Sequence, residues 1–393
     1  MPHQNRRSFL KSSGVTAVPA IWTASVAQAM PVQGRPAVPA RPVIKFYDDG
    51  ETFDVGDYIG ELQRIHEAKP IEVDFYGEGG VAQALESRFA EITGKKKAAL
   101  IPTGTLANQL AISVLSSQKS KVFVQETSHV YRDEADAAQA VFRKRLIPLA
   151  KDRPYFTVDE LRQAIDDVKG RELFPGNIGV VSIENPVRRA DGRVVPIEEI
   201  RRISAFCRRN GIKLHLDGAR LHIASAWRGV PVLEYCSYFD TAYVSLYKYL
   251  GAYAGAVLCG DEEVISAMPH LVKMHGGGLQ SNWTNTAIAL HRLDGLEARL
   301  RDSIARANEI FPLLNRIPGL RVTPLEGGTN MYSMEVTNPI DGKKMQQVLK
   351  DVHGIKIDAL DAANRTLLTV NETLLYRDAD FVASAFAHAM KLS

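Results

Sequence analysis

Apolar and charged residues alternate over residues 212–216, and this pattern predicts a β-strand that ends at Asp217. A second strand is predicted over residues 241–246, where β-branched and aromatic residues are frequent, and Lys248 follows it closely. In open α/β sheets, ligands bind outside the carboxyl ends of the strands. Asp217 and Lys248 are therefore expected to face the same crevice.

Helical periodicity is clearest over residues 81–92, where apolar residues recur at spacings of four, four and three. Further helices are predicted over residues 287–307, 343–351 and 378–390. Further strands are predicted over residues 98–101, 121–124, 180–185, 320–322, 329–336 and 355–357. A chain of 393 residues, 45% hydrophobic and 24% charged, is long enough to bury a large core and to form more than one domain.

A lysine and an aspartate in one crevice suit the chemistry of pyridoxal phosphate. The lysine amine forms a Schiff base with the cofactor aldehyde, and the aspartate keeps the pyridine nitrogen protonated, so that the ring can accept carbanion electrons. Either residue alone is more simply explained as a surface lysine or a turn aspartate. A surface lysine and a turn aspartate are a weaker explanation when the two residues are taken together. The reason is that two motifs, Asp217-Gly-Ala-Arg220 and Ser245-x-x-Lys248-x-x-Gly-Ala, occur in the same chain and in this order.

This combination resembles the threonine aldolase and aromatic amino acid β-eliminating lyase family of pyridoxal phosphate enzymes. The resemblance extends over roughly residues 43–390. It implies fold type I, which is aspartate-aminotransferase-like, with a mostly parallel α/β domain that carries the cofactor and a smaller α+β C-terminal domain. It also implies that Lys248 carries the cofactor, that Asp217 meets the ring nitrogen, and that Ser245 belongs to the cofactor site. Arg220 is expected to lie beside the ring and to bind the substrate as well as the cofactor.

Two further features of the resemblance concern the phosphate and the ring of the cofactor. Thr103-Gly104-Thr105 opens a predicted helix, where free backbone N–H groups and the helix dipole favour an anion. Many helix starts look similar, but the resemblance places the cofactor phosphate on Gly104 and Thr105. His129 follows the strand at 121–124. An isolated histidine is usually solvated or hydrogen-bonded, whereas the resemblance implies that His129 stacks on the ring and can act as a base.

The chain departs from the family at two strand ends. Asp48-Asp49-Gly50 stands where the family has Ser-Asp-Thr near the substrate carboxylate, so Asp48 is either a substrate-binding residue or part of a turn of solvated carboxylates. Glu184 matches the family, and the resemblance implies that it binds the cofactor. After Asn185, however, Pro186-Val187 replaces the Thr-His whose histidine handles the substrate hydroxyl in the family.

Two more positions concern anion binding. Gln280 stands where many members have an arginine that serves the phosphate of a neighbouring subunit. Arg365 falls where the family places an arginine that grips the substrate α-carboxylate, a task that suits a planar guanidinium. An exposed arginine on an edge strand is the alternative. Since two subunits build each site in this class, a homodimer or homotetramer is expected.

The N-terminus resembles a twin-arginine export signal. Asn5-Arg6-Arg7-Ser8-Phe9-Leu10-Lys11 precedes a short apolar run and then Ala27-Gln28-Ala29, an A-x-A cleavage site. A basic tail is the alternative, and the apolar run is too short for a spanning helix. Removal of residues 1–29 would lower Lys plus Arg from 48 to 45, equal to the 45 Asp plus Glu. A neutral mature chain shows no basic footprint for nucleic acid or acidic membranes.

These observations predict a signal over residues 1–29, a linker over 30–42, a cofactor domain over 43–300 and a small domain over 301–393. The expected reaction is cleavage of a β-hydroxy amino acid to glycine and an aldehyde, in the periplasm. One alternative is a β-eliminating lyase that acts on another amino acid, since the loss of Thr-His and the presence of Arg188 and Arg189 could suit an acidic or bulkier side chain. The other is a periplasmic protein that keeps the fold without turnover. Three widely spaced cysteines indicate neither a disulfide framework nor a metal site.

Overall fold

A sheet of seven strands forms the centre of the computed structural model, which describes residues 42–173 and 176–393. The strand order is β2-β8-β7-β6-β5-β3-β4, in which β8 is antiparallel to its neighbours and the other pairings are parallel. The strands are β2 (Lys97–Ile101), β3 (Lys121–Gln125), β4 (Arg145–Leu149), β5 (Ile178–Glu184), β6 (Lys213–Asp217), β7 (Thr241–Ser245) and β8 (Ala256–Gly260). The carboxyl ends of β2, β3, β5, β6 and β7 therefore meet at one edge.

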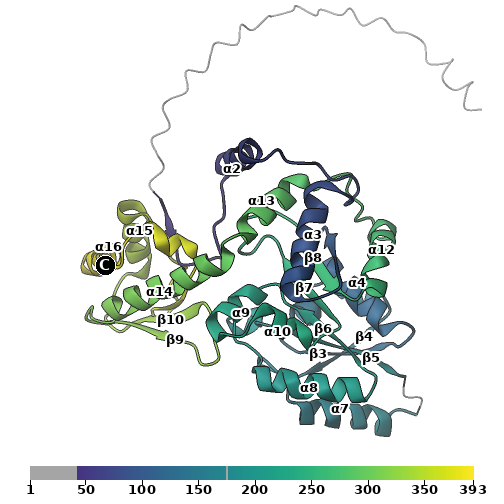
Figure 1. Ribbon diagram of the computed structural model, residues 1–393. Helices are drawn as coiled ribbons and strands as arrows, with labels where there is room; N and C mark the ends of the chain where they lie inside the picture. The colour runs from purple at the N-terminus through teal and green to yellow at the C-terminus, as the bar shows by residue number, and fades with distance from the viewer. Residues whose placement is uncertain (1–41, 174–175) are drawn as a thin grey trace, which may run out of the picture. The chain divides into compact units, whose positions relative to one another are not determined.

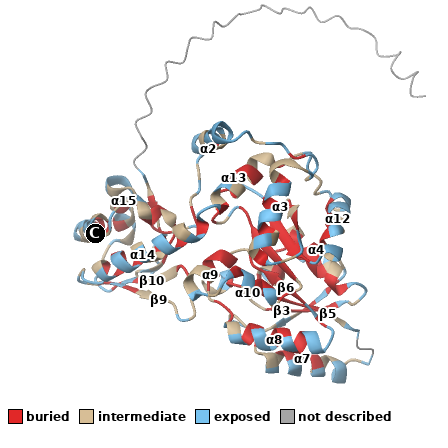
Figure 2. Ribbon diagram, viewed as in Figure 1, coloured by how far each residue is buried: buried red, intermediate tan, exposed pale blue. Residues whose placement is uncertain are grey.

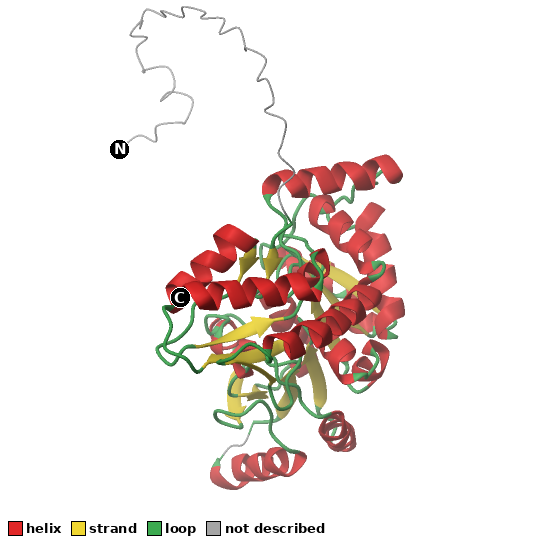
Figure 3. Ribbon diagram, turned by 90° about the vertical axis from the view of Figure 1, so that its left-hand side faces the viewer, coloured by secondary structure: helices red, strands yellow, loops and turns green. Residues whose placement is uncertain are grey.

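Helices cover both faces of this sheet, as Figures 1 and 3 show. Alternate residues of the strands pack on opposite sides: Leu214 and Leu216 contact one layer, while Tyr243 and Leu258 contact the other. One layer comprises α3 (Gly80–Thr93), α7 (Val158–Arg171), α8 (Ile197–Arg209), α9 (Leu221–Arg228), α10 (Val232–Ser237) and α13 (Trp283–Leu293). The other comprises α4 (Gly104–Ser116), α11 (Glu262–Ser266) and α12 (Met268–Met274).

Buried residues of the strands are red in Figure 2 and the outward faces of the helices are blue, so the sheet is the core of this part of the chain. Short helices α5 (His129–Arg132) and α6 (Ala137–Ala140) and the 3₁₀ turn η1 (Arg188–Ala190) lie in the loops that follow β3 and β5. Helix α2 (Val55–Ala68) buries only Tyr58 and packs on α13.

A second core is built from the two ends of the described chain. Three antiparallel strands, β9 (Leu320–Pro324), β10 (Met331–Val336) and β12 (Arg365–Thr369), pack with α14 (Leu296–Leu314), α15 (Gly342–His353) and α16 (Ala379–Leu392). The short strands β1 (Ile44–Lys45) and β11 (Ile355–Lys356) pair in parallel, and η2 (Glu372–Tyr376) precedes α16. Ile44 and Phe46 belong to this core, and the ring of Phe46 meets Phe386 edge to face at 5.9 Å.

The predicted elements are confirmed with small shifts of their ends, except for the helix at 287–307, which was wrong. The structure divides it into α13 and α14, because Gly295 adopts a left-handed backbone conformation, with φ of 70°, at the start of α14. The predicted signal and nearly all of the predicted linker fall on residues 1–41, which lie outside the described residues. None of the described helices is long and apolar enough to cross a membrane.

Candidate active site

The strand ends bring most of the predicted site residues to one edge of the sheet. Asp217 is the last residue of β6, and Lys248 follows the last residue of β7 by three positions. His129 follows β3 and begins α5, while Glu184 ends β5. Gly104 begins α4 just beyond β2. The parallel arrangement of these strands is thus the reason that residues far apart in the sequence meet here.

A cavity of about 450 Å³ opens at this edge, and Lys248 faces it. The amine of Lys248 lies 4.4 Å from the centre of the Tyr247 ring. Burial, and then the positive charge of Arg220, lowers the pKa of Lys248 to about 8. A neutral amine is the nucleophilic form, so the site favours covalent chemistry at Lys248. The lining residues are Asp48, Asp49, Thr52, His129, Arg188, Arg220, Tyr247 and Lys248.

Arg220 lies beside Lys248 and is paired with a carboxylate from the N-terminal segment. Its Nε donates to Asp49 Oδ2 at 2.8 Å, and the exposed fractions of the two side chains are 16% and 14%. Asp48 lines the same cavity and has a left-handed backbone, with φ of 62°. The Asp48-Asp49-Gly50 segment therefore belongs to the cavity wall, where Asp49 balances the charge of Arg220.

Asp217 is held by a buried amide that the sequence alone did not identify. Asn108 Nδ2 donates to Asp217 Oδ2 at 2.8 Å and to Glu134 Oε1 at 2.8 Å. Asn108 Oδ1 is 3.0 Å from His215 Nε2, and His215 Nδ1 is 2.8 Å from Thr241 Oγ1. Burial lowers the pKa of His215 to about 3, so this ring is neutral and donates one hydrogen to Asn108. The orientation of the amide is thereby fixed with its hydrogens toward the two carboxylates.

His129 is positioned by Glu134 and by Glu184. Its Nδ1 lies 2.9 Å from Glu134 Oε1, and this hydrogen bond raises the pKa of His129. The backbone N–H of His129 donates to Glu184 Oε2 at 2.7 Å. Glu184 Oε1 accepts from the backbone N–H of Arg188 at 2.9 Å. Glu184 is buried and does not line the cavity, so the structure gives it the task of holding two loops, while the prediction placed it on the cofactor.

The start of α4 fits a phosphate group. Thr103 Oγ1 accepts from Leu106 N, which leaves the N–H groups of Gly104 and Thr105 without a partner inside the helix. A β-carbon at Gly104 would lie 2.0 Å from the hydroxyl of Tyr243, so only glycine is tolerated there. Ser245 lies on the same face of β7 as Tyr243, and its buried Oγ has no hydrogen-bond partner among the described residues. Free donors at a helix start and an orphaned hydroxyl are what a bound phosphate would satisfy.

Arg365 is not brought to this site. Its guanidinium contacts Asp361 Oδ2 at 3.1 and 3.2 Å, and 58% of its side chain is exposed. Arg365 begins β12, whereas Thr369, at the other end of this strand, donates its N–H to Phe46 O near the cavity wall. The predicted grip on the substrate carboxylate is therefore not supported, because the arginine lies at the wrong end of its strand.

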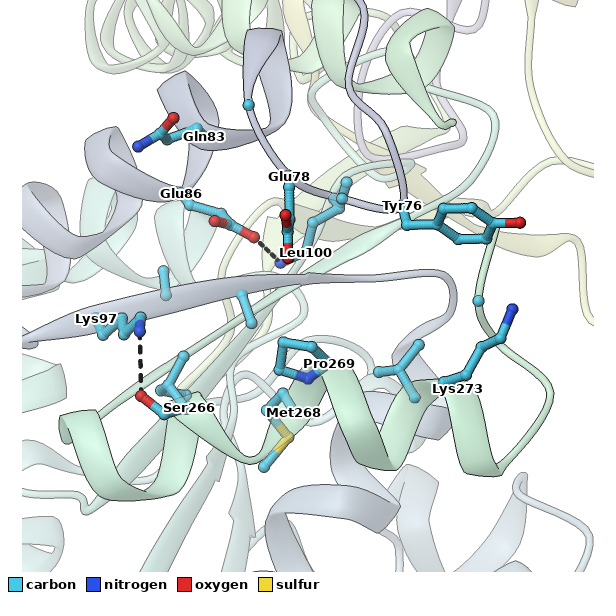
Figure 4. A pocket seen from close by; sticks show the side chains of 17 residues that line it. Tyr76, Glu78, Gln83, Glu86, Lys97, Leu100, Ser266, Met268, Pro269 and Lys273 are labelled. Atoms are coloured by element: carbon cyan, nitrogen blue, oxygen red, sulfur yellow. Dashed lines mark hydrogen bonds between the residues drawn. The ribbon is translucent and has the colours of Figure 1, made fainter. Parts of the chain in front are cut away.

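A larger cavity of about 770 Å³ lies beside the edge strand β2 and contains none of the predicted site residues (Figure 4). Glu86 Oε1 accepts from Leu100 N at 2.7 Å, and burial raises the pKa of Glu86 to about 7. Lys97 contacts Ser266, and Lys273 lies against the ring of Tyr76 at 4.6 Å. The smaller cavity, which Lys248 and His129 line, is therefore the candidate active site.

Comparisons with curated proteins give related enzymes. A low-specificity L-threonine aldolase of Candida albicans is 35% identical over 237 residues, which are 60% of this chain and 63% of that protein, less than two thirds of its length. Low-specificity L-threonine aldolase 1 of Arabidopsis thaliana is 26% identical over 81% of this chain and 90% of its own. An alanine racemase, TOXG, of Cochliobolus carbonum is 34% identical over 56% of each chain.

The fold is also found in a solved structure, and most of the chain matches a family model. Leishmania major threonine aldolase superimposes with a TM-score of 0.68 at 17% identity and covers 89% of this chain and 99% of its own, so it shows the fold alone. The fold is fold type I, and the cofactor predicted from the sequence, pyridoxal phosphate, is confirmed. The model of the beta-eliminating lyases matches residues 62–337, more than half of the chain. In agreement with the resemblance found in its sequence, the chain belongs to the beta-eliminating lyase family.

Proposed function

We propose that the protein cleaves the Cα–Cβ bond of a β-hydroxy amino acid to give glycine and an aldehyde. The observation that carries this proposal is the cavity in which Lys248, His129 and Arg220 meet, with Asp217 buried behind it. The threonine aldolases of Candida albicans and Arabidopsis thaliana, which are similar to this chain, support the choice of reaction.

The residues of the chain divide the work of this reaction. When bound, pyridoxal phosphate supplies a ring that accepts the electrons of the broken bond. The amine of Lys248 would hold the cofactor, the N–H groups of Gly104 and Thr105 would bind its phosphate, and the carboxylate of Asp217 would keep a proton on the ring nitrogen. His129 accepts the proton of the substrate β-hydroxyl, and its hydrogen bond to Glu134 makes it a stronger base.

A second candidate reaction is proton transfer at Cα, as in a racemase. Two observations favour it: the similarity to an alanine racemase, and Pro186-Val187 at the position where the family has the histidine that handles the hydroxyl. Both reactions start from the same site. Alanine therefore belongs in the same assay as threonine and phenylserine, with loss of optical rotation as its readout.

The first test is the substitution Lys248→Ala. We expect release of aldehyde from threonine or phenylserine to fall by about 10³-fold or more, because the nucleophile is lost. Lys344→Ala, at an exposed position of α15, is the matched control and is expected to keep the parent rate. Borohydride reduction of the parent should fix the cofactor on Lys248. Parent-like release of aldehyde by the Lys248 variant would refute the assignment.

The pH dependence of cofactor uptake follows from the lowered pKa of Lys248. The amine is protonated below its pKa of about 8, so the rate of uptake by the apoenzyme should rise about tenfold per pH unit below this value and level off above it. Arg220→Gln removes a positive charge, raises the pKa of Lys248 and moves the level region to higher pH. Stopped-flow absorption at several pH values measures both profiles. Superimposable profiles would contradict the role of Arg220.

We also propose a homodimer or homotetramer. Apolar side chains are exposed beside the cavity at β2, where the backbone N–H of Tyr76 donates to Gln280 O at 2.8 Å. The exposed fractions are 64% for Phe75, 49% for Tyr76, 60% for Met274 and 47% for Leu279. Such a patch suits a protein interface. Phe75→Asp is expected to lower the native mass measured by light scattering, and a parent that is monomeric at micromolar concentration would count against the proposal.

Export by the twin-arginine pathway is proposed for the N-terminal segment. In a bacterium with this pathway, we expect the periplasmic protein to begin at Met30, because Ala27-Gln28-Ala29 is the cleavage site. Replacement of both Arg6 and Arg7 by Lys should leave more than about nine tenths of the protein in the cytoplasm, since the paired arginines are the recognition element. Cell fractionation and N-terminal sequencing measure both outcomes. Equal export of the variant would exclude this pathway.

A further inference from the structure

The two guanidinium groups of the active-site cavity have different surroundings. Arg220 is largely buried and its Nε is bonded to Asp49. Arg188 leaves 55% of its side chain exposed, and its ion pair within the described residues is a long one, 3.7 Å from Nη1 to Asp133 Oδ2. That distance is too long for a hydrogen bond. Arg188 therefore faces the cavity with its hydrogen-bond donors available.

Asp133 is already engaged by the neighbouring arginine. Arg189 Nε donates to Asp133 Oδ2 at 2.9 Å, and Arg189 Nη2 donates to Asp133 Oδ1. The hydrogen bond from Arg189 lowers the pKa of Asp133, as a bidentate pair does. One carboxylate thus meets two guanidinium groups, and it hydrogen-bonds to that of Arg189. The guanidinium of Arg188 keeps only the long ion pair among the described residues.

The backbone of Arg188 is fixed although its side chain is free. Glu184 accepts the N–H of Arg188 with one carboxylate oxygen and the N–H of His129 with the other. A buried carboxylate therefore sets the positions of the cation and of the imidazole relative to each other. The charge of Arg188 also contributes to the lowered pKa of Lys248, which places the guanidinium within electrostatic reach of the amine.

We propose that Arg188 binds the α-carboxylate of the amino acid substrate, the task that the resemblance assigned to Arg365. This inference rests on the proposed use of an amino acid substrate at Lys248. A planar guanidinium with free donors binds a carboxylate through two parallel hydrogen bonds. Arg365 is engaged with Asp361 and lies outside the cavity, while Arg188 lines it.

Asp48 favours the same placement. It lines the cavity, and its carboxylate accepts a long hydrogen bond from Thr52 Oγ1, at 3.5 Å. Among the described residues, no ion pair links Asp48 to Arg188. The negative charge of Asp48 repels a substrate carboxylate, and the positive charge of Arg188 attracts it. A substrate amine or hydroxyl can instead donate a hydrogen bond to Asp48. The cavity therefore distinguishes the two ends of an amino acid.

The test compares a carboxylate with its ester. The holoenzyme is titrated with glycine and with glycine methyl ester, and binding is followed by the change in cofactor absorption. In Arg188→Gln, we expect the Kd of glycine to rise about 10–100-fold, since a charge-assisted pair is lost, and the Kd of the ester to change by less than about twofold. Arg188→Lys should restore part of the affinity for glycine.

Two variants serve as controls. Arg193→Gln lies in the same loop, where Arg193 pairs with Asp191, and Arg365→Gln removes the originally predicted arginine. Both are expected to bind glycine as the parent does. All variants should keep the cofactor absorption of the parent, which shows that the site is folded.

Four outcomes would overturn the proposal. Three of them are parent-like binding of glycine by Arg188→Gln, loss of glycine binding in Arg365→Gln, and a parent that binds glycine no better than its ester. The fourth comes from titration with hydroxyaspartate as a third ligand: a loss of affinity in Arg188→Gln that is confined to hydroxyaspartate would place a side-chain carboxylate on Arg188. The titration breaks no carbon–carbon bond. An enzyme that releases no aldehyde but needs Arg188 to bind glycine would therefore refute the aldolase proposal alone.

Discussion

The buried amide of Asn108 is the interaction on which the active site depends. Its two hydrogens reach Asp217 and Glu134, and its oxygen faces a neutral histidine, His215. An amide is the side chain that offers two donors and an acceptor without adding charge. A carboxylate in its place would bring a third negative charge into a buried cluster, at a high cost in desolvation. The positions of the aspartate behind the cavity and of the imidazole in front of it are thus set by one neutral group.

Glu184 holds backbone groups in position, whereas Asn108 holds side chains. Its oxygens hold the loops after β3 and after β5, from which His129 and Arg188 enter the cavity. Burial, and then the charge of Asp217, raises the pKa of Glu184 to about 7. His129, Arg188 and Lys248, which line the cavity, are partly exposed, while Glu184, Glu134 and Asn108, which hold the surrounding groups in position, are buried. This division keeps the geometry fixed without closing the cavity.

Much of this arrangement was predictable from the sequence, because the relevant residues directly follow apolar strands. Lys248 faces the cavity as that rule predicts, whereas Asp217, also at a strand end, is buried and does not line the cavity. His215 carried a signal that was overlooked: it alternates with Leu214 and Leu216 on a buried strand, where a histidine needs a hydrogen-bond partner. Asn108 and Glu134 gave no comparable signal, since their pairing depends on how helix α4 meets the loop after α5. Arg365 shows the limit of the method, because a motif fixes a position in the chain but not the partner that captures the side chain.

The pairing of β1 with β11 has a consequence for the order in which the chain folds. Ile44 and Phe46 are made early in synthesis, but their partners, from Ile310 to Ala389, emerge last. The seven-stranded sheet can form while the ribosome is still at work, since its last strand ends at Gly260. The second core cannot form until the C-terminal helix has been synthesised. Until then the apolar side chains of Ile44 and Phe46 lack part of the core that covers them. A chain that ends before α16 would leave Phe46 without its contact to Phe386. The exposed apolar surface would then be available to chaperones and proteases.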